Sequence, residues 1–486
     1  MFSNDAEVNT ELAKKINSFS IDFRRRAIKV IVCALLAIGA ISITLGSLQT
    51  KDFATSTATT SYPTVTPSYV PSSSNDAILT DFLITSNISN EFIIPHTPQY
   101  KAKRWMTRDD PLLLSPTGDN NDKILQRYAL ASLYFSLSQE GPSDIDWIEK
   151  DECDSIHIAC NDDGYVRTVM IDGGVGGGVI PNEIGLLKHL ENLSLVNNLL
   201  LSSTIPHAIR DNTELRQINL FNNSLSGSIT DSIHSLPRLS YINLGSNRFT
   251  GELEGGFGNE MEKIILDKND FSGPVLESFF DLPNLSLLSL SHNRFNSLLM
   301  SSTMEGFDSV LEYIYLDDNE LNGTLPLGLN LMNGLKSLSL SNNSFTGKIL
   351  PSMKNLVNLI YLNIANNSFE GYLNTAIRDM KNLKYLIASD NKLSGPLDNL
   401  GTFPDLEVLS ISRNDFHRNS SYDFLASLSS TKISHLSFFE SGLNGTMEAL
   451  CLENLEEAFI DNSVKQTKDT CNLLANREKT IVFIEE

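Results

Sequence analysis

Two short stretches carry residue types that could bind a phosphate group or a calcium ion. The glycine-rich run at 173–178 could bring backbone N–H groups close to a phosphate, but it does not match G-x-G-x-x-G and no Lys-Ser/Thr pair follows it. The stretch 267–272 begins like a calcium loop, yet it lacks the central glycine and the closing glutamate of such loops. We therefore interpret both stretches as turns, and the sequence predicts no catalysis, no cofactor and no metal site.

A second set of residues has the chemistry of a binding surface, because tyrosines flanked by charges recur at positions expected to point outward from short strands. Tyrosine offers a large contact area with a polar tip and is enriched at interaction hot spots. Tyrosine also suits a half-buried strand surface, so the sequence leaves a purely structural role open. The candidate ligand-binding residues are Tyr241, Tyr313, Tyr315, Asp317, Tyr361, Tyr385 and Arg413.

These positions belong to a repeat that begins about every 24 residues between about residue 166 and about residue 461. Its L-x-x-L-x-L segment predicts a strand whose leucines alternate inward while the residues between them point outward. An Asn follows each strand where the chain turns, and a bulky apolar residue, often Phe, follows two residues later. We expect these Asn and Phe residues to form internal columns. The repeats begin at Val166, Leu190, Leu215, Leu239, Met261, Leu285, Leu311, Leu335, Leu359, Leu383, Leu406, Ile433 and Leu455.

The extended pattern L-x-x-L-x-L-x-x-N-x-L/F-x-G-x-I/L-P is nearly intact in residues 190–206 and 311–326. This pattern resembles the plant-type leucine-rich repeat of receptor-like proteins and of related algal surface proteins. The resemblance implies an α/β fold: a horseshoe-shaped leucine-rich-repeat solenoid of about 12 repeats over residues 166–462. The concave sheet of such a solenoid is the surface that commonly binds partners.

Both ends of a solenoid need a cap, because an end repeat would otherwise expose its apolar edge. Residues 121–165 resemble the amino-terminal cap of this repeat class, and a carboxy-terminal cap is expected at 463–486. The first part of the amino-terminal cap is predicted to be a helix, because apolar residues recur there at helical spacing: Ile124, Tyr128, Ala131 and Phe135.

Four cysteines lie at the two ends of the repeat region, where they could hold the caps. Cys153 and Cys160 precede the first repeat, and Cys451 and Cys471 lie on either side of the last one. Local pairing would form two disulfides in an oxidising compartment, although four cysteines allow three pairings. A zinc site is disfavoured, because no His or Cys partners stand at zinc spacing. N-glycosylation is expected at Asn87, Asn192, Asn284, Asn322, Asn419 and Asn444.

Residues 30–48 carry no charge, and their length approaches the ~20 residues that a membrane-spanning helix needs. Basic residues cluster before this run, so residues 1–29 are expected to stay cytoplasmic while the repeats become extracellular or lumenal. A cleaved signal peptide is the alternative, but its apolar region usually has only ~7–15 residues. Residues 49–120, rich in Ser, Thr and Pro at their start, are expected to form a stalk and linker.

The net charge of −22 argues against nucleic-acid binding, which depends on basic residues that neutralise phosphates. We therefore expect a non-enzymatic, membrane-anchored, receptor-like or adhesive protein that binds an extracellular protein, peptide or glycan. The sequence carries no kinase signature set, so a signalling co-receptor is a further expected partner. The resemblance also permits a secreted inhibitor of extracellular enzymes or a structural wall component.

Overall fold

The computed structural model describes residues 73–484, with gaps at 113, 115–119, 138–144, 175–176, 199–202, 230, 301–309, 398–401, 417–427, 444–453 and 462–479. The expected cytoplasmic tail, membrane span and first part of the stalk therefore lie outside the described residues. The same holds for most of the expected carboxy-terminal cap, for Cys451 and Cys471, and for Asn419 and Asn444. None of the helices in the described ranges combines the length and apolar character needed to cross a membrane.

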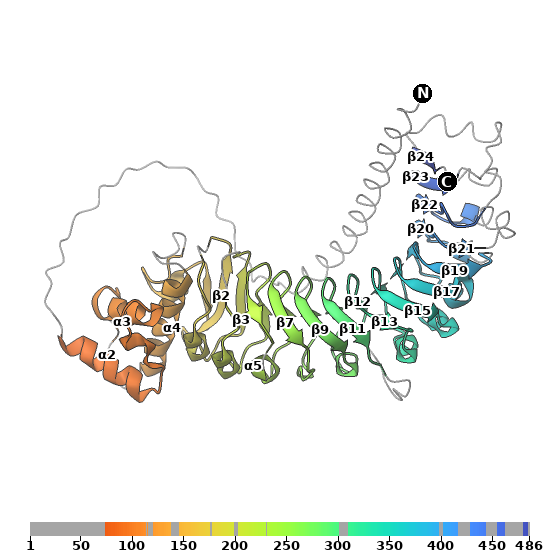
Figure 1. The fold of residues 1–486 in the computed structure, drawn as a ribbon. Coiled ribbons are helices and arrows are strands. Elements are labelled where there is room, and N and C mark those ends of the chain that lie inside the picture. Colours follow the sequence, from red (N-terminus) through yellow and green to blue (C-terminus); the bar gives the residue numbers. More distant parts are fainter. Residues whose placement is uncertain are drawn as a thin grey trace, which may run out of the picture. The chain divides into compact units, whose positions relative to one another are not determined.

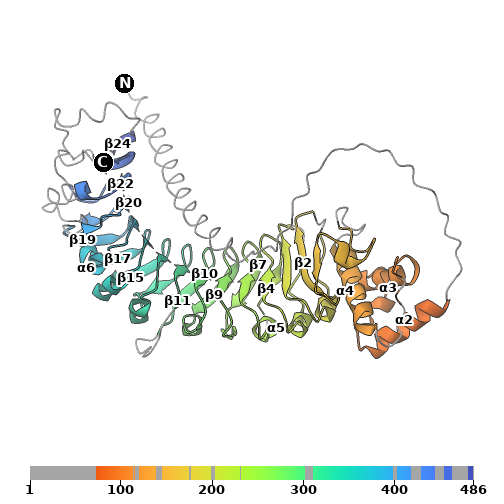
Figure 2. The same cartoon turned by 180° about the vertical axis from the view of Figure 1, so that it is seen from behind.

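Successive repeats each add one strand to a single large sheet. Figures 1 and 2 show these strands side by side, from β2 in yellow to the blue strands of the last repeats. All neighbours pair in parallel except β1 (Ile158–Cys160), which runs antiparallel to β2. The parallel strands are β2 (Val166–Asp172), β3 (Asn192–Val196), β4 (Gln217–Asn219), β6 (Tyr241–Asn243), β8 (Lys263–Ile265), β10 (Leu287–Ser289), β12 (Tyr313–Tyr315), β14 (Ser337–Ser339), β16 (Tyr361–Asn363), β18 (Tyr385–Ile387), β20 (Val408–Ser410), β22 (His435–Ser437), β23 (Glu457–Asp461) and β24 (Thr480–Ile484).

The register of this sheet places equivalent repeat positions opposite one another. Ile314 of β12 pairs with Leu338, and Leu338 pairs with Leu362 of β16. All three side chains are at most 1% exposed, so the central residue of each strand points into the core. The residues on either side of it point to the opposite face, as the period-2 alternation of a strand requires. The predicted leucine-rich-repeat solenoid with its long parallel sheet is confirmed.

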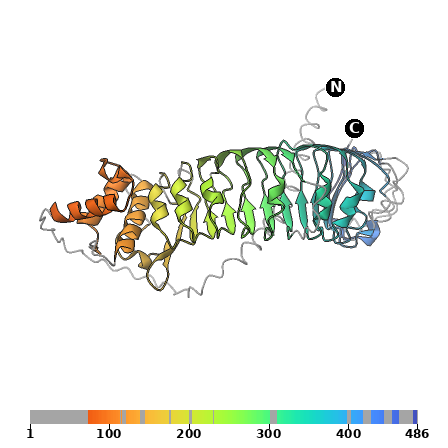
Figure 3. The same cartoon turned by 90° about the horizontal axis from the view of Figure 1, so that it is seen from below.

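The return path of the repeats that begin at Leu215 through Leu406 contains a second short strand and, in most of them, a short helix (Figure 3). Gly395 shows why the repeat carries a glycine in this strand: its φ is +83°, and a Cβ there would lie 2.3 Å from the ring of Tyr372. The short strands form two smaller parallel sheets: β5 (Ser226–Gly227), β7 (Arg248–Glu252), β9 (Asp270–Val275) and β11 (Arg294–Leu298), then β13 (Asn322–Gly323), β15 (Ser344–Lys348), β17 (Ser368–Tyr372), β19 (Lys392–Gly395) and β21 (Asp415–Phe416). The helical turns are η3 (Asn182–Leu186), η4 (His207–Asp211), α5 (Asp231–His234), η5 (Glu277–Phe279), η6 (Leu327–Leu331), η7 (Pro351–Asn355), α6 (Leu373–Ile377) and η10 (Leu428–Ser430).

Phenylalanine rings stack between neighbouring repeats inside the solenoid. The rings of Phe249 and Phe271 lie 6.1 Å apart at 5°, and those of Phe271 and Phe295 lie 6.4 Å apart at 17°. A second stack joins Phe345 to Phe369 at 5.8 Å and 11°. All five rings are fully buried. The spacing of these rings follows from the register, because each ring sits at the same position of its repeat.

Asparagine side chains link the repeats through the backbone at the turn after each strand. The Nδ2 group of Asn247 donates to the carbonyl oxygens of Leu220 and Leu244, and its Oδ1 accepts from the backbone N–H of Leu225. Asn269 repeats this arrangement one repeat later. Each amide therefore satisfies buried backbone groups of its own repeat and of the repeat before it.

Four helical segments precede the repeats and form a second hydrophobic core (Figure 1): α2 (Ser73–Thr85), η1 (Asn90–Ile93), α3 (Pro98–Arg108) and α4 (Asn121–Leu137). These helices differ from the stalk and linker expected over 49–120: residues from Ser73 onward form helices that pack on the cap. The physical reason is apolar spacing on short helices: Leu79 and Leu83 of α2 and Ala102 and Met106 of α3 all point into this core. Helix α4 begins at Asn121, where the sequence predicts a helix.

The amino-terminal cap is held by a buried ion cluster and by one disulfide. The Arg127 guanidinium is 1% exposed, donates to Asp110 at 3.0 Å and Glu152 at 2.9 Å, and stacks on the Trp105 ring. Cys153 and Cys160 form a disulfide with a Cα–Cα distance of 5.6 Å. These contacts fix the antiparallel strand β1 against the first repeat.

Candidate functional site

The outward side chains of the large sheet form one continuous surface, which we call the sheet face. The sheet face carries five of the seven candidate residues within its strands, namely the tyrosines of β6, β12, β16 and β18. Tyr241, Tyr313 and Tyr385 are partly exposed, whereas Tyr315 and Tyr361 are only 3% and 5% exposed. The latter two lie on the outward side of their strands but are largely covered by neighbouring side chains.

The structure brings three of the candidate residues together and adds a fourth residue that the sequence did not single out as a ligand contact. Asp267 follows β8 and Asp317 follows β12, each two residues after its strand. Burial raises the pKa values of Tyr315 and Tyr361, and the negative charges of nearby carboxylates, both of them for Tyr315 and Asp317 for Tyr361, raise these pKa values further. We call Asp267, Tyr315, Asp317 and Tyr361 the acidic–tyrosine cluster.

Serine residues from β10 and its turn hold the two carboxylates of the cluster. Ser289 Oγ donates to Asp267 Oδ1 at 2.7 Å, and the backbone N–H of Ser291 donates to the same oxygen at 2.9 Å. Ser291 Oγ donates to Asp317 Oδ1 at 2.9 Å. The carboxylates are thus positioned by hydroxyl and backbone donors, which carry no full charge.

Burial and mutual repulsion perturb the titration of the cluster. Desolvation, together with the nearby negative charge of Asp317, raises the pKa of Asp267 to about 6. Desolvation likewise raises the pKa of Asp317, with the neighbouring Asp318 as an additional charge, and raises the pKa of Tyr315 to about 12. Both tyrosines are therefore neutral at physiological pH, and any negative charge in the cluster comes from the carboxylates.

The other candidate residues lie outside this cluster or are already engaged. Tyr385 pairs directly with Tyr361 in the sheet, with ring centroids 6.1 Å apart, and its hydroxyl donates to Glu407 at 3.0 Å. Tyr241 lies on β6, with β8 and β10 between it and β12. Arg413 forms ion pairs with Asp390 and Glu440 and stacks on the Phe439 ring, so it links three neighbouring repeats.

Charged residues elsewhere on the sheet face form ion pairs between neighbouring repeats. Arg167 pairs with Glu191 at the first repeats, Glu312 pairs with Lys336 in the middle, and Lys384 pairs with Glu407 toward the last repeats. Asp267 and Asp317 make no such pair with a basic side chain among the residues that the structure describes. The two carboxylates of the acidic–tyrosine cluster are instead held by hydroxyl and backbone donors.

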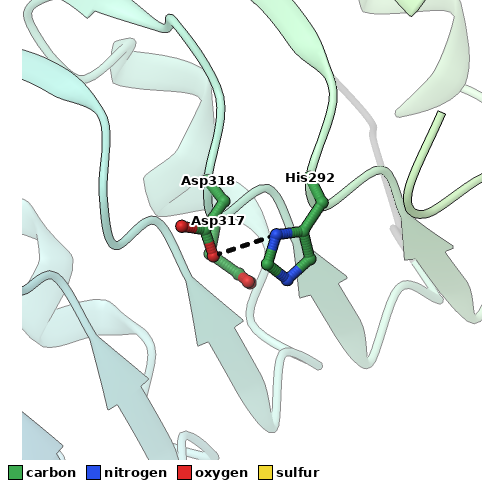
Figure 4. A group of neighbouring side chains, drawn as sticks. All are labelled: His292, Asp317 and Asp318. Carbon is green, nitrogen blue, oxygen red and sulfur yellow. Dashed lines mark ion pairs between the residues drawn. The ribbon is translucent and has the colours of Figure 1, made fainter. Parts of the chain in front are cut away.

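His292 and Asp318 lie next to Asp317 of the cluster, and the possible ligand atoms of these three residues are within 4.8 Å of one another. Figure 4 shows both carboxylates beside the imidazole, whose Nδ1 is 3.4 Å from Asp318 Oδ2. Such a set could in principle bind a divalent cation. Asp318, however, also accepts a hydrogen bond from Asn342, which in turn accepts one from Asn366. This side-chain ladder between repeats accounts for the arrangement without a metal.

The expected glycosylation sites differ in accessibility. Asn87, Asn284 and Asn322 are exposed, and the last of these lies on the short strand β13 away from the sheet face. Asn192 begins β3 and is only partly exposed, and its Nδ2 donates to Thr168 Oγ1 at 3.2 Å. A glycan at Asn192 would lie on the sheet face, whereas a glycan at Asn322 would leave the sheet face free.

Comparison with known proteins agrees with this architecture. The family model "Leucine Rich Repeat" matches residues 214–236 and 334–356. "Receptor-like protein 6" of Arabidopsis thaliana is 29% identical over 130 residues, which are 27% of this chain and 12% of that protein. The crystal structure of PEPR1–AtPEP1 matches with a TM-score of 0.60 at 26% identity, over 76% of this chain and 52% of that one. The crystal structure of a TDR receptor matches with a TM-score of 0.53 at 22% identity, over 64% and 53% of the two chains.

The chain therefore spans about half of each matched receptor structure and a much smaller share of Receptor-like protein 6. The family model matches two of the repeats that the sequence pattern predicted. The repeats have the leucine-rich-repeat fold, and the chain resembles the plant receptor-like proteins.

Proposed function

We propose that this chain is a receptor-like protein that binds an extracellular peptide or protein ligand on its sheet face. The observation that carries the proposal is the row of partly exposed tyrosines on β6, β12 and β18 of the sheet face, with the acidic–tyrosine cluster beside them. The similar PEPR1 structure is a complex with AtPEP1, which supports a binding role for a solenoid of this kind. We propose Tyr241, Tyr313, Tyr385 and Arg413 as neighbouring contacts of the same ligand.

The geometry of the sheet supports binding on this surface. Parallel strands with equivalent register present rows of side chains at a constant spacing of about 4.8 Å. An extended ligand that crosses the strands could therefore contact one side chain per repeat. Partly exposed tyrosines on β6, β12 and β18 would supply the contact area, and interface energy is commonly concentrated in such residues.

The test is capture of a ligand by the immobilised full-length chain from extracellular fluid, compared with a Tyr313→Ala/Tyr385→Ala variant. We expect the parent to retain a component that the variant loses by at least tenfold, because both rings would contact it. Tyr372→Ala is the matched control, since Tyr372 is 52% exposed on β17, which belongs to a smaller sheet. Equal capture by the parent and the double variant would contradict binding on the sheet face.

We further propose that residues 30–48 anchor the chain in a membrane with the repeats outside the cytoplasm. The uncharged run and the basic residues before it support this topology. External protease on intact cells should then remove the repeats and leave an amino-terminal tag protected. A secreted inhibitor or wall component would instead appear in the medium or wall without residues 1–29, and recovery of that form would contradict the anchor.

A further inference from the structure

We infer that Glu183 makes the attachment of the helices before the cap sensitive to pH: they are held tightly while its carboxyl is protonated and loosely once it is ionised. We call these helices, α2, η1 and α3, the helical unit. The inference goes beyond the proposed function, because none of the residues that carry it belongs to the sheet face. Two observations carry it, namely the place of Glu183 in the fold and the neutral groups around its carboxylate.

The first observation is that Glu183 departs from the pattern of the helical turns on the return path. It is the second residue of η3, which follows Pro181. The corresponding second residues of later turns are all small: Ala208 in η4, Ser278 in η5, Gly328 in η6 and Ser352 in η7. These repeats form the same turn without a carboxylate. The role of Glu183 therefore lies in what its side chain contacts outside its own repeat.

Those contacts join the first repeat to the helical unit. Glu183 is 2% exposed, and its Oε2 accepts a hydrogen bond from Nε2 of Gln99 in α3 at 2.8 Å. Its Oε1 accepts from the hydroxyl of Ser89, the residue that precedes η1, at 3.3 Å. Gln99 is itself only 4% exposed. The carboxylate thus lies inside the interface that must separate if the helical unit moves away from the first repeat.

The second observation is that both donors to this buried carboxylate are neutral. Glu183 forms no ion pair within the part of the chain that the structure describes. The buried charge of Arg127 in the same cap is, in contrast, compensated by Asp110 and Glu152. A buried charge without an opposite partner is costly. Burial therefore raises the pKa of Glu183, and the hydrogen bonds from Gln99 and Ser89 only partly oppose this rise.

The charged groups on the surrounding elements do not neutralise Glu183. Glu91 of η1 is a second carboxylate, and its negative charge raises the pKa of Glu183 further. Tyr128 of α4 stays neutral, because burial and then the charge of Glu183 raise the pKa of its hydroxyl. Lys103 of α3 pairs with Asp76. The other charged side chains of α3 and α4, apart from Arg127, are exposed or partly exposed: Lys101, Arg104, Arg108, Asp122 and Lys123.

The neighbouring turn η4 and the residues after η3 add three further charged groups and a histidine. Asp211 of η4 lies 4.0 Å from Lys188 and 3.9 Å from Arg210. The Nδ1 of His207 lies 2.9 Å from the hydroxyl of Ser232 in the next repeat. These groups are therefore engaged with one another or with the next repeat, and Glu183 is the buried carboxyl that faces the helical unit.

The direction of the effect follows from the raised pKa. The carboxyl of the attached state binds a proton more readily than the solvated carboxyl of a detached state. Attachment is therefore strongest below the ordinary glutamate pKa of ~4.3 and weakens as the pH rises through the raised value. The second hydrophobic core, in which Leu83 and Phe92 meet Tyr128, holds the helical unit at every pH. Ionisation thus increases local opening without unfolding the solenoid.

The experiment is hydrogen exchange of the purified full-length chain at pH 4.5 and pH 8, with exchange times scaled for the intrinsic effect of pH. Protection of α2, η1 and α3 should be about fivefold or more lower at pH 8, whereas protection of β6 to β18 should change less than about twofold. Equal protection of the helical unit at the two pH values would overturn the inference. The same loss along the whole chain would overturn it too.

Two substitutions should change this pH ratio in opposite directions. Glu183→Gln removes the titrating group, so the ratio should fall to about one, which also excludes the nearby His207 as the source. Gln99→Leu removes a hydrogen bond that favours the ionised carboxylate, so the ratio should rise. A purely structural contact would loosen the unit equally at both pH values. A ratio that Gln99→Leu leaves unchanged or lowers would therefore contradict the inference, even if Glu183→Gln detaches the unit outright.

Asp81→Asn is the matched control, because it removes one carboxylate charge from an exposed position of the same helical unit. It should keep the pH ratio of the parent, and loss of the ratio in this control would mean that the net charge of the unit, not Glu183, sets its attachment. Acrylamide quenching gives a second readout, since Trp105 of α3 stacks on the Arg127 guanidinium at 4.8 Å and Trp147 is fully buried. Quenching should be stronger at pH 8 than at pH 4.5 in the parent but not in Glu183→Gln, and equal pH dependence in both would refute the role of Glu183.

Discussion

Replacing Asn247 with alanine should destabilise the solenoid far more than the loss of one polar side chain on the surface. Asn247 is 9% exposed, and its amide bonds the backbone of two repeats. The substitution removes the acceptor of the buried Leu225 N–H, which has no other acceptor among the hydrogen bonds that the structure describes. An unsatisfied buried donor costs ~1–3 kcal/mol.

The free-energy loss at each carbonyl group is smaller, because each carbonyl oxygen keeps a second donor from a neighbouring asparagine. Leu220 O also accepts from Asn223, and Leu244 O also accepts from Asn269. Each of these lost bonds should therefore cost only the net ~0.5–1.5 kcal/mol of an ordinary hydrogen bond. The donor and the two carbonyl groups together give an expected loss of about 4 kcal/mol in the free energy of unfolding.

Urea unfolding followed by circular dichroism measures this loss, and hydrogen exchange locates it. Exchange should accelerate at the repeats around β4, β6 and β8 and change little beyond β18, because each repeat contacts only its neighbours. Asn358→Ala is the control, since its exposed amide makes one bond, to Asn333 O, and should cost ~0.5 kcal/mol or less. A loss in Asn247→Ala no larger than in the control would refute the view that these amides hold the repeats together.

Four further substitutions test other parts of the description. Phe345→Ala should lower the free energy of unfolding by ~3–5 kcal/mol, because the ring is fully buried and stacked on its neighbour. Tyr313→Ala on the sheet face should change the free energy of unfolding by only ~0.5 kcal/mol in the same urea titrations. Asp267→Asn should raise the free energy of unfolding at pH 7.5 by ~1–2 kcal/mol, below the ~3 kcal/mol that the full pKa shift allows. Because the pKa of Asp267 is raised in the folded state, its protonated carboxyl favours folding, and this stabilisation is lost as the pH rises through 6. The gain in stability from the substitution should therefore vanish near pH 4. Cys160→Ser should cost ~2 kcal/mol and speed hydrogen exchange at β1 and β2 but not beyond β12, which peptide-resolved mass spectrometry would detect.

The repeat is the part of this protein that the sequence determines by itself. One period of about 24 residues specifies a strand, a turn and a return path, and stacking buries the same positions in every repeat. The inward leucines, the Asn ladder and the Phe stacks therefore could be assigned from short-range spacing alone. The helix from Asn121 was also predictable, because its apolar residues recur at helical spacing.

The helices before the cap were not predictable in the same way. Segments α2, η1 and α3 are short, and their apolar residues are too few to bury a face on their own. Leu83 and Phe92 are fully buried only because they meet Tyr128 and Ile124 of α4 in one core. A contact across such a distance in the chain leaves no periodic signal in either segment.

The acidic–tyrosine cluster was predicted only in part. Tyr315, Asp317 and Tyr361 were identified because they occupy outward positions of the repeat, but Asp267 was interpreted solely as part of a turn. Alignment of the residues that follow each strand would have placed Asp267 in the same column as Ser291 and Asp317. The sequence alone still could not show that serines hold both carboxylates.

The sequence thus determined the architecture, because in a strict repeat the conformation favoured by each local segment agrees with the fold of the whole solenoid. Only the tertiary structure decided the chemistry of the sheet face. Repeat lengths vary by a few residues, so the register between strands selects which side chains meet. Among the described residues, that register gives Asp267 and Asp317 no ion pair with a lysine or arginine but pairs Lys384 with Glu407. Charge pairing across strands depends on distances of a few ångströms, which spacing along the chain does not specify.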